Sequence, residues 1–86
     1  MEIYNKTTDK FGIKFNNVRR FHPDWFVINE KSDEEIMLHR ARCPHFDFNI
    51  KVNLAANAKY CSEDRRELER WARQKQVKLQ HCKTCI

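Results

Sequence analysis

The chain has 86 residues, enough for one domain, residues 1–86, with a small core. Charged residues make up 34% and hydrophobic residues 41%, a balance that excludes an intrinsically disordered chain. The net charge of +5 allows a nucleic-acid-binding surface but does not require one. No apolar run reaches the about 18 residues of a membrane span, and the N-terminal segment lacks the apolar core of a signal peptide. We therefore expect a cytoplasmic protein without a membrane partner.

The N-terminal part of the chain has the pattern of a β-sheet. Residues 11–15 (FGIKF) alternate between apolar and polar side chains, which predicts a half-buried strand that pairs with residues 3–6. A further short strand is expected at residues 25–29, and the polar run EKSDEE (30–35) predicts the turn that follows it. These elements indicate an antiparallel sheet.

The clearest strand is predicted at residues 46–54, where five apolar side chains alternate with polar ones. Two residues separate it from another expected strand, residues 36–43, so we expect a hairpin with Cys43 opposite Phe46. This register turns one set of side chains toward the core and the other set outward. The outward set is Ile36, Leu38, Arg40 and Arg42.

From Ser62 onward the hydrophobic period becomes that of a helix. Ser62 is a suitable N-cap, and apolar residues along one stripe predict an amphipathic helix over residues 62–80. The predicted fold is therefore α+β. An antiparallel sheet of four to five short strands (residues 1–60) is followed by one C-terminal helix packed across it and a Cys-x₂-Cys tail (residues 61–86).

The four cysteines point to a metal site, because disulfides are rare in the cytoplasm and small domains often need a staple. Eighteen residues of helix rise ~27 Å, which matches the ~27 Å span of a nine-residue strand. The helix should therefore carry the tail back to the hairpin turn. We predict a structural zinc ion bound by Cys43, His45, Cys82 and Cys85, with His81 as a substitute for His45.

The same distances exclude two other candidate ligands. Cys61 precedes the predicted helix, and His39 lies four strand residues from Cys43, ~13 Å away. Two alternatives to a metal site remain. The thiols are either plain reduced side chains or a redox pair, although Cys82 would follow a helix instead of opening one.

Two functions of different classes fit these features. The first is a zinc-binding nucleic-acid-binding or regulatory module, although the acidic residues among its arginines also suit an ordinary solvated helix. The second is a protein-binding adaptor or inhibitor that docks on a larger complex through the outward set Ile36, Leu38, Arg40 and Arg42. No motif of an enzyme is present, and we expect no catalytic activity. The predicted nucleic-acid-binding residues are Arg66, Arg70, Arg73, Lys75 and Lys78.

Overall fold

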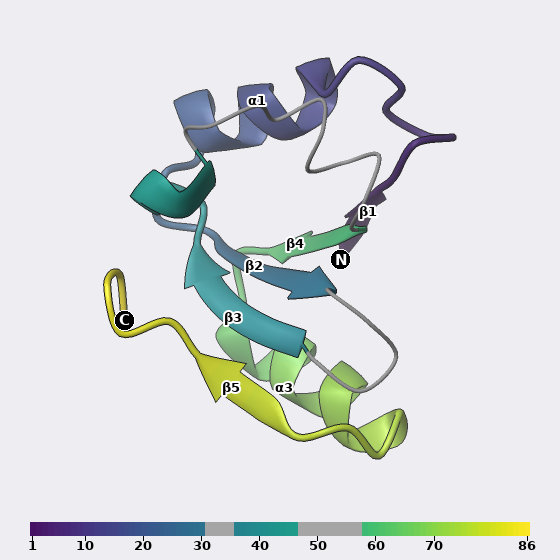
Figure 1. Cartoon of the computed structure of the whole chain (residues 1–86), viewed down its shortest axis with the longest axis vertical. Helices are drawn as coiled ribbons and strands as arrows, with labels where there is room; N and C mark the ends of the chain where they lie inside the picture. Colours follow the sequence, from purple (N-terminus) through teal and green to yellow (C-terminus); the bar gives the residue numbers. More distant parts are fainter. Residues whose placement is uncertain (31–35, 47–57) are drawn as a thin grey trace.

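The structure, a computed structural model, describes residues 1–30, 36–46 and 58–86. In this part of the chain five strands form one sheet in the order β1-β4-β2-β3-β5 (Figure 1). All neighbouring strands are antiparallel except β3 and β5, which run parallel. The α+β class is confirmed, whereas the purely antiparallel sheet is wrong. The elements are β1 (Glu2–Tyr4), α1 (Ile13–Phe21), β2 (Phe26–Glu30), β3 (Ile36–Arg40), a 3₁₀ turn (Pro44–Phe46), β4 (Lys59–Ser62), α3 (Arg65–Gln74) and β5 (Leu79–His81).

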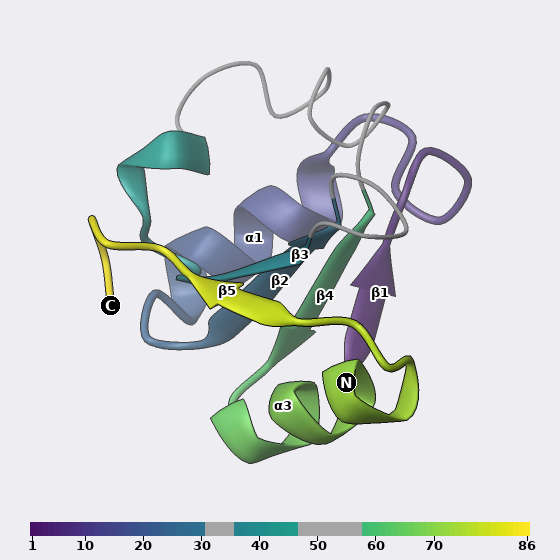
Figure 2. The same ribbon diagram turned by 60° about the horizontal axis from the view of Figure 1, so that its bottom comes forward.

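The two helices cover opposite faces of the sheet (Figure 2). Neighbouring residues of a strand point to opposite faces, so Val27 and Ile28 of β2 enter two different cores. We call these the α1-side core and the α3-side core. The α1-side core contains Phe15, Val18, Val27, Ala41, Cys43, Phe46, Cys61 and Cys82. The α3-side core contains Ile28, Ile36, Leu38, Leu68 and Ala72.

Helix α1 occupies the place where the sequence predicted a strand at residues 11–15. The carboxylate of Asp9 accepts hydrogen bonds from the backbone N–H groups of Lys14 (3.0 Å) and Phe15 (2.9 Å), which caps the helix from outside. Gly12 at the N-cap has a φ of 73°, a conformation that glycine adopts without strain. The apolar alternation was too short to distinguish the two periods, and the buried pair Phe15 and Val18 has helical spacing.

The predicted hairpin between residues 36–43 and 46–54 is also wrong. Both edges of β3 are already paired, one with β2 and the other with β5. After β3 the chain reverses, because the N–H of Cys43 donates to the carbonyl of Arg40 (2.9 Å) and Phe46 lies in the 3₁₀ turn. Residues 47–54 of the predicted strand lie outside the described residues.

The C-terminal helix is shorter than the predicted 62–80. Ser62 belongs to β4, and the N-cap is Asp64, whose carboxylate accepts from the N–H of Arg66 (3.0 Å). The helix ends near Lys75, and Gln76 turns the chain with a φ of 58°. The last residues then return as β5, so a strand and not a helix carries the tail to the top of the sheet.

Candidate metal centre

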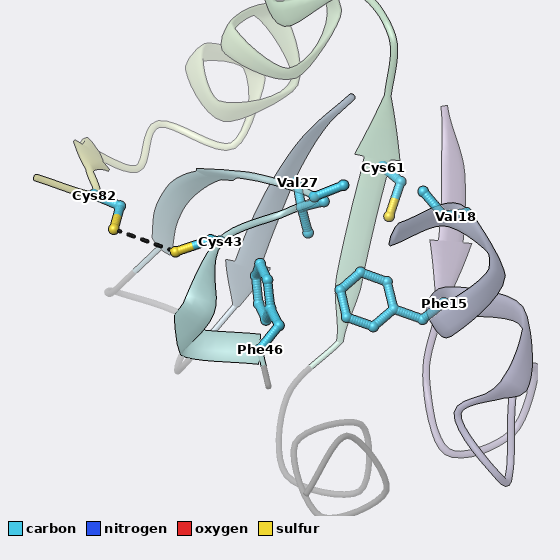
Figure 3. Packing of buried hydrophobic residues seen from close by; sticks show 8 residues of the cluster. Phe15, Val18, Val27, Cys43, Phe46, Cys61 and Cys82 are labelled. Atoms are coloured by element: carbon cyan, nitrogen blue, oxygen red, sulfur yellow. Dashed lines mark hydrogen bonds between the residues drawn. The ribbon is translucent and has the colours of Figure 1, made fainter. Parts of the chain in front are cut away.

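Four histidine and cysteine side chains converge beyond the end of β3. His39 comes from β3, Cys43 and His45 come from the loop 41–46, and Cys82 directly follows β5. One ligand atom from each lies within 4.8 Å of the other three. The Sγ atoms of Cys43 and Cys82 are 3.7 Å apart (Figure 3), and the Sγ of Cys82 is 3.5 Å from Nδ1 of His45.

Strand pairing explains how Cys82 reaches this place. In the parallel register Leu38 lies beside His81, and the N–H of Cys82 donates to the carbonyl of Leu38 (2.9 Å). The tail is therefore fastened along β3 and delivers Cys82 to the point where β3 ends. The predicted convergence of Cys82 with Cys43 is observed, but the cause is a strand pairing and not a long helix.

His39 was excluded on a distance that assumed a straight strand through Cys43. The chain turns after Arg40, so Cys43 folds back toward His39 and the two side chains belong to one group. The ring of His39 also lies at 5.8 Å and nearly perpendicular to the ring of His45. Pro44 was the sequence signal for this turn, because proline cannot continue a central strand.

The spacing of these donors fits a tetrahedral ion. Zinc bonds of ~2.0–2.3 Å in a tetrahedron place the ligand atoms about 3.3–3.8 Å apart. The two separations at Cys82, 3.7 Å to Cys43 and 3.5 Å to His45, fall in that interval. Two thiols and two imidazoles are a donor set that zinc prefers. The group can therefore hold a metal ion with small adjustments of its side chains.

Cys85, the remaining predicted ligand, lies at the margin of this group. Its Sγ accepts a hydrogen bond from the backbone N–H of Arg40 (3.2 Å), and its side chain is half-buried against the α1-side core. Its thiol also contacts those of Cys43 and Cys82. Among the described residues, neither Cys61 nor His81 belongs to the group. Cys61 lies on β4 within the α1-side core (Figure 3), and His81 is exposed.

The thiols of Cys43 and Cys82 differ in their readiness to ionise. Burial raises the pKa of Cys43 to about 12. Burial also disfavours the thiolate of Cys82, but hydrogen bonds from the backbone N–H groups of Thr84 and Cys85 lower its pKa to about 6. Cys82 follows the strand β5 and not a helix, so its position does not count against a redox-active pair of thiols. Cys82 is therefore the more readily ionised thiol of this pair.

The five predicted nucleic-acid-binding residues are all exposed on α3 and the segment that follows it. Arg66 pairs with Asp64 (3.4 Å), and Lys75 pairs with Glu30 (3.6 Å). Within the described ranges, Arg70 and Arg73 form no ion pair. These two arginines and Arg66 line one hollow on the helix together with Asp64 and Glu69.

The two apolar residues of the predicted protein-binding surface are buried in the structure. Ile36 and Leu38 are 2% and 0% exposed, because they lie in the α3-side core beneath the helix. Arg40 is half-buried with its guanidinium 4.9 Å from the centre of the Phe26 ring. Arg42 is exposed and pairs with Asp24 (2.9 Å). The error follows from the wrong hairpin, which assigned these side chains to an open face.

Comparison of the chain with protein-family models, with curated proteins and with solved structures found no match. In the part of the chain that the structure describes, no helix combines the length and apolar character of a membrane crossing.

Proposed function

We propose that this chain is a non-catalytic zinc-binding domain that binds nucleic acid through the exposed basic face of α3. The zinc part of the proposal is carried by the convergence of four sulfur and nitrogen ligand atoms within 4.8 Å of one another. Four protein ligands fill a tetrahedral zinc ion and leave no position for a substrate, so the role of the ion is structural. It would tie the C-terminal tail to the loop 41–46.

We propose Cys43, His45, Cys82 and His39 as the ligands. A ring nitrogen of His39 lies within 4.8 Å of the ligand atoms of the other three residues, whereas the Sγ of Cys85 is hydrogen-bonded to the N–H of Arg40. The sequence-predicted set, in which Cys85 replaces His39, is the competing assignment. The two sets differ in the number of thiolates on the metal, two against three.

Native mass spectrometry of the purified chain tests the zinc proposal. We expect one zinc ion per chain, and its loss in Cys43→Ser and Cys82→Ser, because a missing ligand opens the tetrahedron. Cys61→Ala is the matched control, since it removes a buried thiol outside the group and should keep its zinc. A parent chain that holds no metal would refute the proposal and favour plain or redox-active thiols.

Cobalt substitution separates the two ligand sets. The intensity of the thiolate-to-cobalt charge-transfer band increases with the number of bound thiolates. If His39 is the fourth ligand, His39→Asn should weaken binding strongly and Cys85→Ser should leave the spectrum of the parent nearly unchanged. The reverse result would assign Cys85.

Nucleic-acid binding is supported by the placement of the cations on α3. Arg66, Arg70 and Arg73 lie at helical spacing along one exposed stripe, and among the described residues Arg70 and Arg73 have no ion-pair partner. Free guanidinium groups on a helix surface are available to phosphate oxygens. Such binding would be insensitive to base sequence and sensitive to salt.

A triple substitution tests this interface. Arg70→Gln, Arg73→Gln and Lys78→Gln together should weaken binding to DNA and RNA and reduce the salt slope by up to ~0.9 log units per lost contact. The matched control is Lys10→Gln, Lys14→Gln and Arg20→Gln, which removes the same charge from exposed positions near α1. Equal losses in both triple variants would show that only net charge acts. If the parent binds neither nucleic acid at ~50 mM salt, where phosphate contacts are strongest, the adaptor function becomes the better interpretation.

A further inference from the structure

Arg19 of α1 directs its guanidinium group at the loop that carries two of the proposed zinc ligands. Its Nε donates to the carbonyl of Ala41 (2.7 Å), its NH1 nitrogen to the carbonyl of Phe46 (3.0 Å), and its NH2 nitrogen to the carbonyl of Cys43 (3.2 Å). The same guanidinium lies 5.7 Å from the centre of the Phe46 ring. One side chain thus contacts both ends and the middle of the loop 41–46.

The loop depends on such contacts because it lies beyond the paired part of β3. Its first residues are held from outside the loop, since the N–H of Ala41 donates to Trp25 (2.7 Å) and that of Arg42 donates to Pro23 (3.2 Å). The carbonyls of Ala41, Cys43 and Phe46 instead face Arg19. A guanidinium is a rigid planar group, so hydrogen bonds from three of its nitrogens set the relative positions of the three carbonyls.

We propose that Arg19 is a positioning residue for the zinc centre, which holds the loop so that Cys43 and His45 face Cys82 before the ion binds. This inference depends on the proposed zinc site. Cys43 is itself one of the contacted residues, and His45 lies between the contacted carbonyls of Cys43 and Phe46. Loss of an interaction that orients metal ligands typically weakens metal binding by about 10–100-fold.

The alternative is that Arg19 only fastens α1 to the rest of the fold. The apolar side chains Phe15 and Val18 already bury the inner face of α1 in the α1-side core. The helix therefore has its own attachment, and a change at Arg19 should act mainly on the loop. This difference allows the positioning role to be tested apart from stability.

The experiment compares three variants of the full chain. Arg19→Gln keeps a polar side chain but loses the planar guanidinium and its charge, whereas Arg19→Lys keeps the charge. Arg20→Gln is the matched control at the exposed neighbouring position. Zinc affinity is measured by competition with a chelator, and the ligand geometry by the visible spectrum of the cobalt form. We expect zinc binding about 10–100-fold weaker in Arg19→Gln with an altered cobalt spectrum, an intermediate loss in Arg19→Lys, and parent values in Arg20→Gln.

Each outcome separates this inference from the proposed function. A parent chain that binds no zinc refutes the function itself. A parent that binds zinc, together with an Arg19→Gln variant of equal affinity and equal cobalt spectrum, refutes the positioning role alone. If both Arg19 variants stay unfolded in saturating zinc, Arg19 is a general folding residue, which also overturns the inference.

Discussion

The two faces of the sheet are held together by different means. The α3-side core consists entirely of apolar side chains from β2, β3 and α3. The α1-side core contains three buried cysteines, and it ends at the cluster of thiols and imidazoles. Apolar burial alone closes the α3-side face, whereas the α1-side face combines apolar burial with thiols and imidazoles close enough to hold a metal ion.

The tail connects the two faces within a few residues. Leu79 at the start of β5 packs against the α3-side core, and Cys82 just after β5 enters the α1-side core. Burial of a large aliphatic side chain contributes ~1.5–3 kcal/mol, while a thiol contributes less. We therefore expect the α3-side core to hold β5 and the proposed zinc ion to hold the end of the tail.

The largest effect is expected from a charge in the α3-side core. Leu38 is 0% exposed, and Leu38→Asp would place a carboxylate among aliphatic side chains, at a cost of more than about 4 kcal/mol. We expect an unfolded chain by circular dichroism. Gln80→Asp, at an exposed position on the neighbouring β5, should stay folded. A folded Leu38→Asp chain would mean that this face is not the closed core described above.

Removal of the metal should act on the other face. At a free zinc concentration a hundredfold above the dissociation constant, binding adds about 2.7 kcal/mol to the free energy of unfolding. A chelator should remove this amount from the parent and nothing from Cys82→Ser. Hydrogen exchange should accelerate in the loop 41–46 and the tail before it accelerates in α3. Simultaneous loss of protection in both regions would refute the division into two independently closed faces.

A smaller, pH-dependent effect is expected at Lys59, which is buried on the α1 side. Its ammonium donates to Asn29, and burial lowers its pKa from 10.5 to about 8. Between these values the unfolded chain binds more protons, so the stability contributed by Lys59 rises with pH. Lys59→Met should be more stable than the parent near pH 7, and its advantage should shrink above pH 8 by at most about 1.4 kcal/mol per pH unit. Urea titrations of both chains from pH 7 to 10 measure the difference, and a constant difference would contradict it.

The smallest effect is expected at Arg42, which lies in the same loop as the proposed ligands. Its ion pair with Asp24 joins side chains that are 58% and 77% exposed, and such pairs contribute less than about 1 kcal/mol. Arg42→Gln should therefore leave both the free energy of unfolding and the zinc affinity near parent values. A loss as large as that of Arg19→Gln would mean that any cation near the loop supports the site.

Local pattern was sufficient to predict several elements. The strand expected at residues 25–29 is β2, and the strand expected at residues 36–43 contains β3 in its first part. The helical period after Ser62 reveals α3, although not its end. The two strands could be predicted because short apolar segments flanked by polar or turn residues are typical of buried strands, and α3 because its apolar residues recur at helical spacing.

The sequence by itself therefore determined the α+β class. It also predicted that Cys43 meets Cys82, but through a long helix that the structure replaces with a pairing of β5 to β3. Only the tertiary structure decided that α1 is a helix, that β5 pairs parallel to β3, and that His39 and Arg19 lie at the same loop. The pairing of β5 and the contacts of Arg19 depend on hydrogen bonds between residues distant in the chain, whereas α1 and the turn that brings Cys43 to His39 depend on local hydrogen bonds. Neither the cap that Asp9 provides for α1 nor the pairing of β5 with the edge of β3 changes the spacing of apolar residues along these segments. The hydrophobic pattern of the sequence therefore could not reveal them.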